Sequence, residues 1–99
     1  EQLKIGKGYD HCFVLNKNSS QAAELSSDAS GRKLIISTNQ PGIQFYSGNH
    51  LSGFFNKNQG LCLETQHFPD SPNNDSFPTT KLISNKEYYS ETIYFFDVI

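Results

Sequence analysis

Hydrophobic and polar positions in this chain group into short runs, and no stretch keeps the 3.6-residue period of an amphipathic helix over a useful length. Apolar or β-branched residues gather at 12–15, 33–38 and 43–46, and a longer aromatic run fills 88–99. Gly, Pro, Asn, Asp and Ser separate these runs, as turn residues separate strands. The pattern predicts an all-β chain.

The strongest turn signal is Asp28–Arg32, which predicts a hairpin that makes residues 22–27 and 33–38 antiparallel. Pro41 and Gly42 end the second of these strands, because proline cannot donate to the ladder. In the next run, 43–46, side chains alternate between two faces. If the aliphatic face is the core, Gln44 and Tyr46 point together toward a cleft or solvent.

The run at 88–99 is rich in aromatic and β-branched residues, so an exposed copy of it would be prone to aggregation. We therefore predict a central strand of a larger sandwich. Residues 71–80 are predicted to be a surface loop, residues 81–83 a short strand or bridge, and residues 1–9 a loop or strand lead-in.

Composition narrows the possible partners. The 99 residues amount to one domain or less, with 35% hydrophobic and 18% charged residues and a net charge of −2. There is no basic cluster, so we expect no nucleic-acid partner. No apolar run approaches the roughly 18 residues of a membrane helix, and the amino terminus lacks a secretion signal, so we expect no membrane partner and a cytoplasmic location.

The stretch 60–70 places an acid directly after an apolar run. Leu61–Leu63 predicts a strand with little solvent on either face, Glu64 follows, and Pro69 ends the segment. A carboxylate there needs donors, a cation or a polar cavity. Glu64 is thus a candidate general base at a strand end that opens on a cleft. The alternative is a glutamate that points into water from an edge strand.

Asp10 is the other carboxylate predicted at a strand terminus. Paired carboxylates also serve glycosidases, so a glycoside hydrolase using Asp10 and Glu64 is open on chemistry alone. The three histidines have no metal-like spacing, and no metal site is predicted. Cys12 and Cys62 lie in apolar runs and are interpreted as buried thiols, with a disulfide left open.

Three ordered motifs carry a resemblance that runs from about Gly8 to the aromatic end. They are Gly8-Tyr9-Asp10-His11-Cys12-Phe13-Val14-Leu15, then Ser30-Gly31-Arg32 leading through Thr38 into residues 40–49, and then Cys62-Leu63-Glu64-Thr65-Gln66 followed by Phe68-Pro69-Asp70. Together they resemble the aldose 1-epimerases, the galactose mutarotases.

The resemblance implies a large antiparallel β-sandwich and an enzyme that interconverts the α and β anomers of hexoses such as galactose or glucose. It implies Glu64 as the general base, with Asp10 and Gln44 as ligands of the sugar. No cofactor is implied, because ring opening to the aldehyde needs only an acid and a base. The family's histidine acid lies upstream of the first motif and has no counterpart here. Tyr46 and Phe68 are candidates for stacking on the sugar.

Residues 1–99 are therefore expected to be the carboxy-terminal part of a single aldose 1-epimerase β-sandwich domain, partnered by the rest of the same polypeptide upstream. The chain opens on Glu1 and has no methionine, which agrees with this expectation. Alone, the segment is expected to be inactive. A non-catalytic carbohydrate-binding β-domain is the alternative outside the enzymes.

Overall fold

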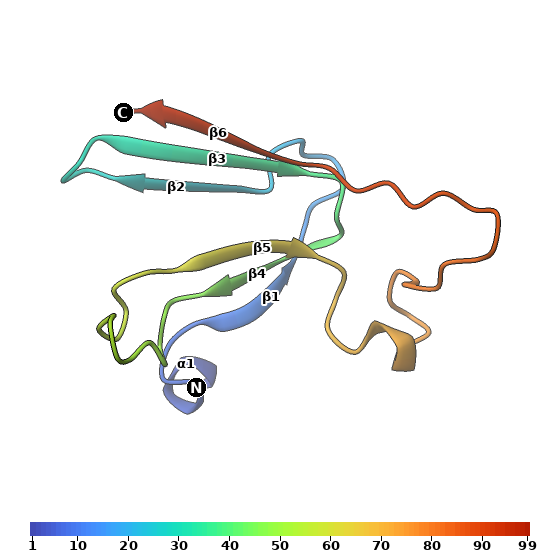
Figure 1. Ribbon diagram of the computed structural model, residues 1–99, viewed down its shortest axis with the longest axis horizontal. Coiled ribbons are helices and arrows are strands. Elements are labelled where there is room, and N and C mark those ends of the chain that lie inside the picture. The colour runs from blue at the N-terminus through green and yellow to red at the C-terminus, as the bar shows by residue number, and fades with distance from the viewer.

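The computed structural model describes residues 1–99 as two three-stranded antiparallel sheets (Figure 1). One sheet has the strand order β1-β4-β5 and the other β2-β3-β6. In chain order the elements are α1 (Gln2–Ile5), β1 (Asp10–Val14), β2 (Ala23–Ser27), β3 (Arg32–Thr38), β4 (Gly42–Tyr46), β5 (Cys62–Gln66), the 3₁₀ turn η1 (Ser71–Asn73) and β6 (Thr92–Val98). The predicted all-β class is confirmed.

The two sheets form the layers of a sandwich, and the best-buried aliphatic side chains lie between them. Ile36 of β3 is 0% exposed and Ile43 of β4 is 4% exposed. At one end of the sandwich, the hydroxyls of Thr65, near the end of β5, and Thr92, at the start of β6, lie 2.6 Å apart and hydrogen-bond. Farther along, an apolar cleft of about 440 Å³ separates the layers, and Phe13, Phe45 and Leu63 are among its lining residues.

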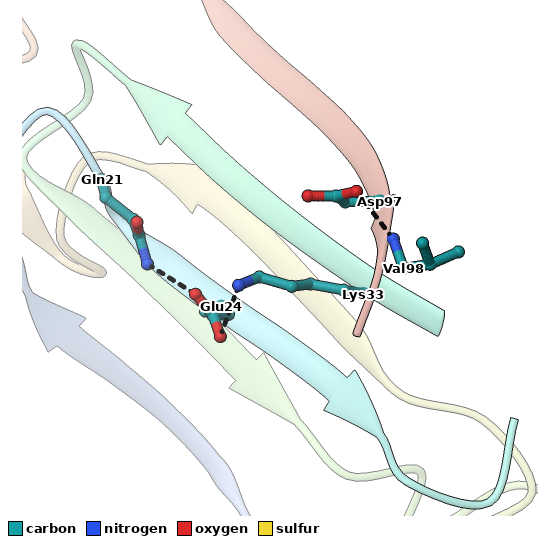
Figure 2. Close-up of polar contacts among 5 residues, drawn as sticks. All are labelled: Gln21, Glu24, Lys33, Asp97 and Val98. Atoms are coloured by element: carbon teal, nitrogen blue, oxygen red, sulfur yellow. Dashed lines mark hydrogen bonds and ion pairs between the residues drawn. The ribbon is translucent and has the colours of Figure 1, made fainter. Parts of the chain in front are cut away.

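The predicted hairpin at Asp28–Arg32 is confirmed, since β2 pairs antiparallel with β3 across it. The outer face of this sheet is polar in part. Figure 2 shows Lys33 reaching Glu24 on the neighbouring strand, with 3.2 Å between Nζ and Oε1, while Gln21 donates to the same carboxylate. Asp97 lies opposite Lys33 on β6, so Lys33 on the middle strand has an acidic residue on each neighbouring strand.

The aromatic carboxy-terminal segment forms a strand, but β6 begins at Thr92 rather than at residue 88, and it pairs only with β3. Within this chain β6 is therefore an edge strand, and its central position in a larger sandwich stays a prediction. No other segment of these 99 residues pairs with its second edge. Phe96 is 77% exposed as a result.

Two further expectations need correction. The segment expected to be loop or strand lead-in contains the single helical turn α1, and residues 81–83 form neither strand nor bridge. Instead, the segment between β5 and β6 is attached through side chains of the turn after β3. Asn39 bonds the backbone of Tyr89 and Glu91, and the buried Gln40 donates to the hydroxyls of Tyr88 and Ser90. No helix is long and apolar enough to cross a bilayer.

Candidate active site

The residues with candidate chemistry gather on the face of the β1-β4-β5 sheet that points away from the other layer. We call this surface the polar face. Side chains alternate along strands, and the register pairs Asp10 with Tyr46, and Gln44 with both Cys12 and Glu64. The prediction that Gln44 and Tyr46 share a face is consistent with this register. Residues of the polar face are Asp10, Cys12, Gly42, Gln44, Tyr46, Cys62, Glu64 and Gln66.

Gln44 lies at the centre of the polar face, on the middle strand. Its Nε2 donates to Oδ1 of Asp10 at 2.8 Å, across the diagonal between β4 and β1. On the other side, Glu64 of β5 is its direct register partner. The other end of the amide, Oε1, is buried and has no hydrogen-bond partner. The structure therefore brings the three predicted site residues onto three adjacent strands, with the amide between the two carboxylates.

The local setting of Glu64 differs from the one predicted. It is the third residue of the five in β5, not the strand end, and it is exposed. The strand is also not covered on both faces, because Cys62 and Leu61 are exposed while Leu63 is half-buried. The three-residue apolar run suggested two covered faces, whereas Leu61 and Leu63 line the cleft between the layers and Cys62 lies on the opposite, polar face. Asp10 is at a strand terminus, as predicted.

The backbone just before Asp10 is held by the loop that follows β4. Asn49 is 5% exposed and donates through Nδ2 to the carbonyl of Tyr9 at 2.8 Å. Ser47 donates its backbone N–H to the same carbonyl and accepts the N–H of Tyr9 at its Oγ. The side chain of Ser47 in turn donates to Asn49. The contacts of Ser47 and Asn49 with Tyr9 were not predicted from the sequence, because polar residues of this kind are common in loops. Their only signal was the Ser-Gly-Asn triplet directly after an alternating strand.

Aromatic side chains border the polar face. The hydroxyl of Tyr46 accepts the backbone N–H of His50 at 2.9 Å, which anchors the ring to the following loop. Phe68 packs edge-on against Phe77, with 5.2 Å between ring centroids, and its ring passes close to the backbone of Gly42. A Cβ built at Gly42 would lie 3.0 Å from this ring and 3.0 Å from Sγ of Cys12. Glycine at this position lets Phe68 approach the sheet.

Both cysteines are free thiols, and both lie on the polar face. Cys12 is half-buried, and burial raises its pKa above the ordinary thiol value, an effect that a hydrogen bond with Gln66 partly opposes. Cys62 is exposed, so the interpretation of two buried thiols is wrong for it. Its position at the start of β5 leaves it without cover from the other layer.

The histidines are dispersed, and the structure contains no cluster of three or more His, Cys, Asp or Glu residues that could hold a metal ion. His67 bonds Oε1 of the buried Gln40 through Nδ1 at 2.9 Å and so belongs to the attachment of the segment before β6. His11 accepts the backbone N–H of Asp10. Asp10, His11 and His50 line a hollow of about 380 Å³ beside the polar face.

Similarity to known proteins identifies the family of this chain. The family model described as aldose 1-epimerase matches residues 1–95. The chain belongs to the aldose 1-epimerase family.

Curated relatives of this family carry the same segment within longer chains. Galactose mutarotase from Mus musculus is 42% identical over 101 residues, which cover 92% of this chain and 30% of the mouse protein. The Homo sapiens galactose mutarotase is 41% identical over 101 residues, which cover 92% of this chain and 30% of the human protein. Aldose 1-epimerase from Escherichia coli K12 is 38% identical over 108 residues, covering 97% of this chain and 31% of the bacterial protein. The chain thus spans about a third of the length of the relatives it matches.

Proposed function

We propose that the protein containing this chain is an aldose 1-epimerase that interconverts the α and β anomers of a hexose such as galactose or glucose. Glu64 is the general base in this proposal, and Asp10 and Gln44 bind hydroxyls of the sugar. The observation that carries it is the placement of Gln44, which is hydrogen-bonded to Asp10 and directly opposite Glu64 on one open face. Relatives named for this reaction support the assignment.

The chemistry suits these side chains. Glu64 removes the proton of the C1 hydroxyl, the bond from C1 to the ring oxygen breaks, and an acid protonates that oxygen, which yields the open-chain aldehyde. Rotation about the bond between C1 and C2, followed by the reverse steps, closes the other anomer. Asp10 accepts hydrogen bonds from sugar hydroxyls, while Gln44 can donate and accept. The mechanism requires no cofactor.

We further propose that residues 1–99 form the carboxy-terminal part of a single β-sandwich domain, and that an upstream histidine of the same cytoplasmic polypeptide is the acid. The chain's share of about a third of its relatives' length supports this division. So does β6, whose second edge and aromatic side chains are left uncovered by these 99 residues. The segment by itself should therefore lack epimerase activity.

Polarimetry of freshly dissolved α-galactose and α-glucose with the intact protein tests the proposal. Glu64→Ala should lower kcat by roughly 10²–10⁴-fold, the range of a positioned acid or base. Glu87→Ala, which removes a carboxylate from the exposed segment before β6, is the matched control and should be silent. Full activity of Glu64→Ala would remove Glu64 from the mechanism. Binding of sugar without turnover by the parent protein would favour a non-catalytic carbohydrate-binding domain.

Asp10→Asn isolates the proposed binding role. It should raise KM for the sugar more than it lowers kcat, because the change removes an acceptor that contacts the substrate before and during reaction. Release of a free sugar from a glycoside, abolished by changing either Asp10 or Glu64, would instead indicate a glycoside hydrolase.

A further inference from the structure

The carbonyl end of the Gln44 amide is a buried acceptor that no donor of the structure satisfies. Buried acceptors without a partner are uncommon, since each costs about 1–3 kcal/mol. Reversing the amide would not remedy this, because Oε1 would then face the acceptor oxygen of Asp10 and the buried end would become an unpaired donor. The orientation with Nε2 toward Asp10 is therefore favoured, and Oε1 is left available.

The register places a potential donor for Oε1 on the neighbouring strand. Glu64 is the direct register partner of Gln44, and directly paired residues on one face of an antiparallel sheet have Cβ atoms about 4.5–5.5 Å apart. An ionised glutamate cannot donate a hydrogen bond, but a protonated one has a single O–H donor. The other titratable groups on this face are Asp10, Cys12, Tyr46 and Cys62.

We propose that Gln44 is a positioning residue for the proton relay: when Glu64 has taken the proton of the C1 hydroxyl, its new O–H donates to Oε1 of Gln44. This inference deepens the proposed function and rests on it for the catalytic step. The proton moves from the sugar oxygen to the Glu64 carboxylate, the ring bond electrons leave with the ring oxygen, and the upstream acid protonates that oxygen. The new hydrogen bond holds the acid form of Glu64 in place for the return transfer.

The hydrogen bond between Gln44 and Asp10 decides that Gln44 acts as the acceptor in the proposed contact with Glu64. Because Nε2 donates to the Asp10 carboxylate at 2.8 Å, the nitrogen end of the amide is held toward β1, and no hydrogen bond joins Gln44 to Glu64 in the structure. Asp10 thus orients the amide so that Oε1 is the end left free to accept a hydrogen bond. The ionised base gains no hydrogen bond from Gln44, whereas the protonated base does, and the contact therefore strengthens as the reaction proceeds.

A double-mutant cycle tests the contact without relying on activity. Glu64→Gln places a permanent N–H donor where the protonated carboxyl would be, so it mimics that state. In the intact protein it should raise Tm by about 2 °C more in the Gln44 background than in the Gln44→Met background, as expected for one hydrogen bond in a chain of roughly 300 residues. Relief of repulsion between Glu64 and Asp10 occurs in both backgrounds and cancels in the comparison.

Equal changes of Tm in the two backgrounds would overturn the proposal. If Gln44→Met does not fold, Gln44→Ala serves as the second background.

Steady-state kinetics of Gln44→Met test whether the proposed hydrogen bond contributes to catalysis. Loss of a bond formed only after proton transfer should lower kcat about 10-fold, in addition to any rise in KM from lost sugar contacts. A rise in KM with kcat unchanged would overturn the relay role and leave Gln44 as a sugar ligand. Failure of the proposed function is distinguishable, because it appears as unimpaired activity of Glu64→Ala, whatever the Tm cycle shows.

Discussion

Asn49 holds the carbonyl of Tyr9 through a 2.8 Å hydrogen bond, and Tyr9 is the residue directly before Asp10. A buried loop amide after β4 therefore fixes the backbone at Tyr9, 40 residues earlier in the chain and directly before β1. The contact explains how a terminal strand position can present a carboxylate in a defined place.

Asn49→Ala should destabilise the protein by about 1–3 kcal/mol, because the carbonyl of Tyr9 loses one of its donors and the Ser47 hydroxyl loses the closer of its two acceptors. It should also raise KM for the sugar, since Asp10 loses its fixed backbone. Urea unfolding and polarimetry measure the two effects. Asn18→Ala, in an exposed turn, is the control and should change stability by less than about 0.5 kcal/mol.

Gly42→Ala tests the close approach of Phe68 to the sheet. The added Cβ would lie 3.0 Å from both the Phe68 ring and Sγ of Cys12, so one of them must move. We expect a loss of about 1–3 kcal/mol, the usual cost of overpacking, measurable by thermal unfolding. Gly60→Ala, whose nearest neighbour would be Leu51 at 3.9 Å, should be nearly neutral. A neutral Gly42→Ala would show that Phe68 does not need this space.

Thr92→Val tests the hydroxyl contact between the two layers. Thr92 lies 2.6 Å from the hydroxyl of Thr65 and 3.1 Å from that of Thr38, and valine keeps its shape without the oxygen. The free energy of unfolding should fall by about 1–2 kcal/mol, since part-buried hydroxyls lose a partner. Thr80→Val in the exposed loop is the matched control. Equal stability of the two variants would mean that the layers do not depend on this contact.

The two thiols should differ in their reaction with iodoacetamide. Cys62 is exposed and should be alkylated first, which would add bulk beside Glu64 and lower activity. Burial raises the pKa of Cys12, so its thiolate fraction at pH 8 is reduced, and its labelling should rise only as the pH passes above the ordinary thiol range. Mass spectrometry of the labelled peptides over a pH series gives both rates. Cys62→Ser should retain activity after the same treatment at pH 7.

The raised pKa of Cys12 should also make the free energy of unfolding depend on pH in the alkaline range. Because the folded-state pKa is above the unfolded value, the contribution of this thiol is present at neutral pH and is lost as the pH rises through the folded value. Cys12→Ala should therefore reduce the alkaline loss of stability relative to the parent. An unchanged alkaline profile would show that other groups control it.

Much of the strand layout could be predicted from local pattern. The hairpin at Asp28–Arg32, the alternation that places Gln44 beside Tyr46, and the terminal position of Asp10 follow from turn residues and the two-residue strand period, and the register agrees with them. The exposed, mid-strand position of Glu64 could not be predicted, because an apolar run next to an acid has the same sequence pattern whether its strand is covered on one face or on two. The edge position of β6 within this chain could not be predicted either, because an aromatic and β-branched run indicates apolar surface but not which segment covers it.

By itself, the sequence determined the all-β class, the turns, the two sides of each strand and the family. These depend on the period of side chains and on residue identity. Only the tertiary structure decided that β1, β4 and β5 form one sheet while β2 and β3 join β6 in the other. That pairing sets the register in which Gln44 lies between Asp10 and Glu64, and register comes from contacts between distant segments that no local pattern contains.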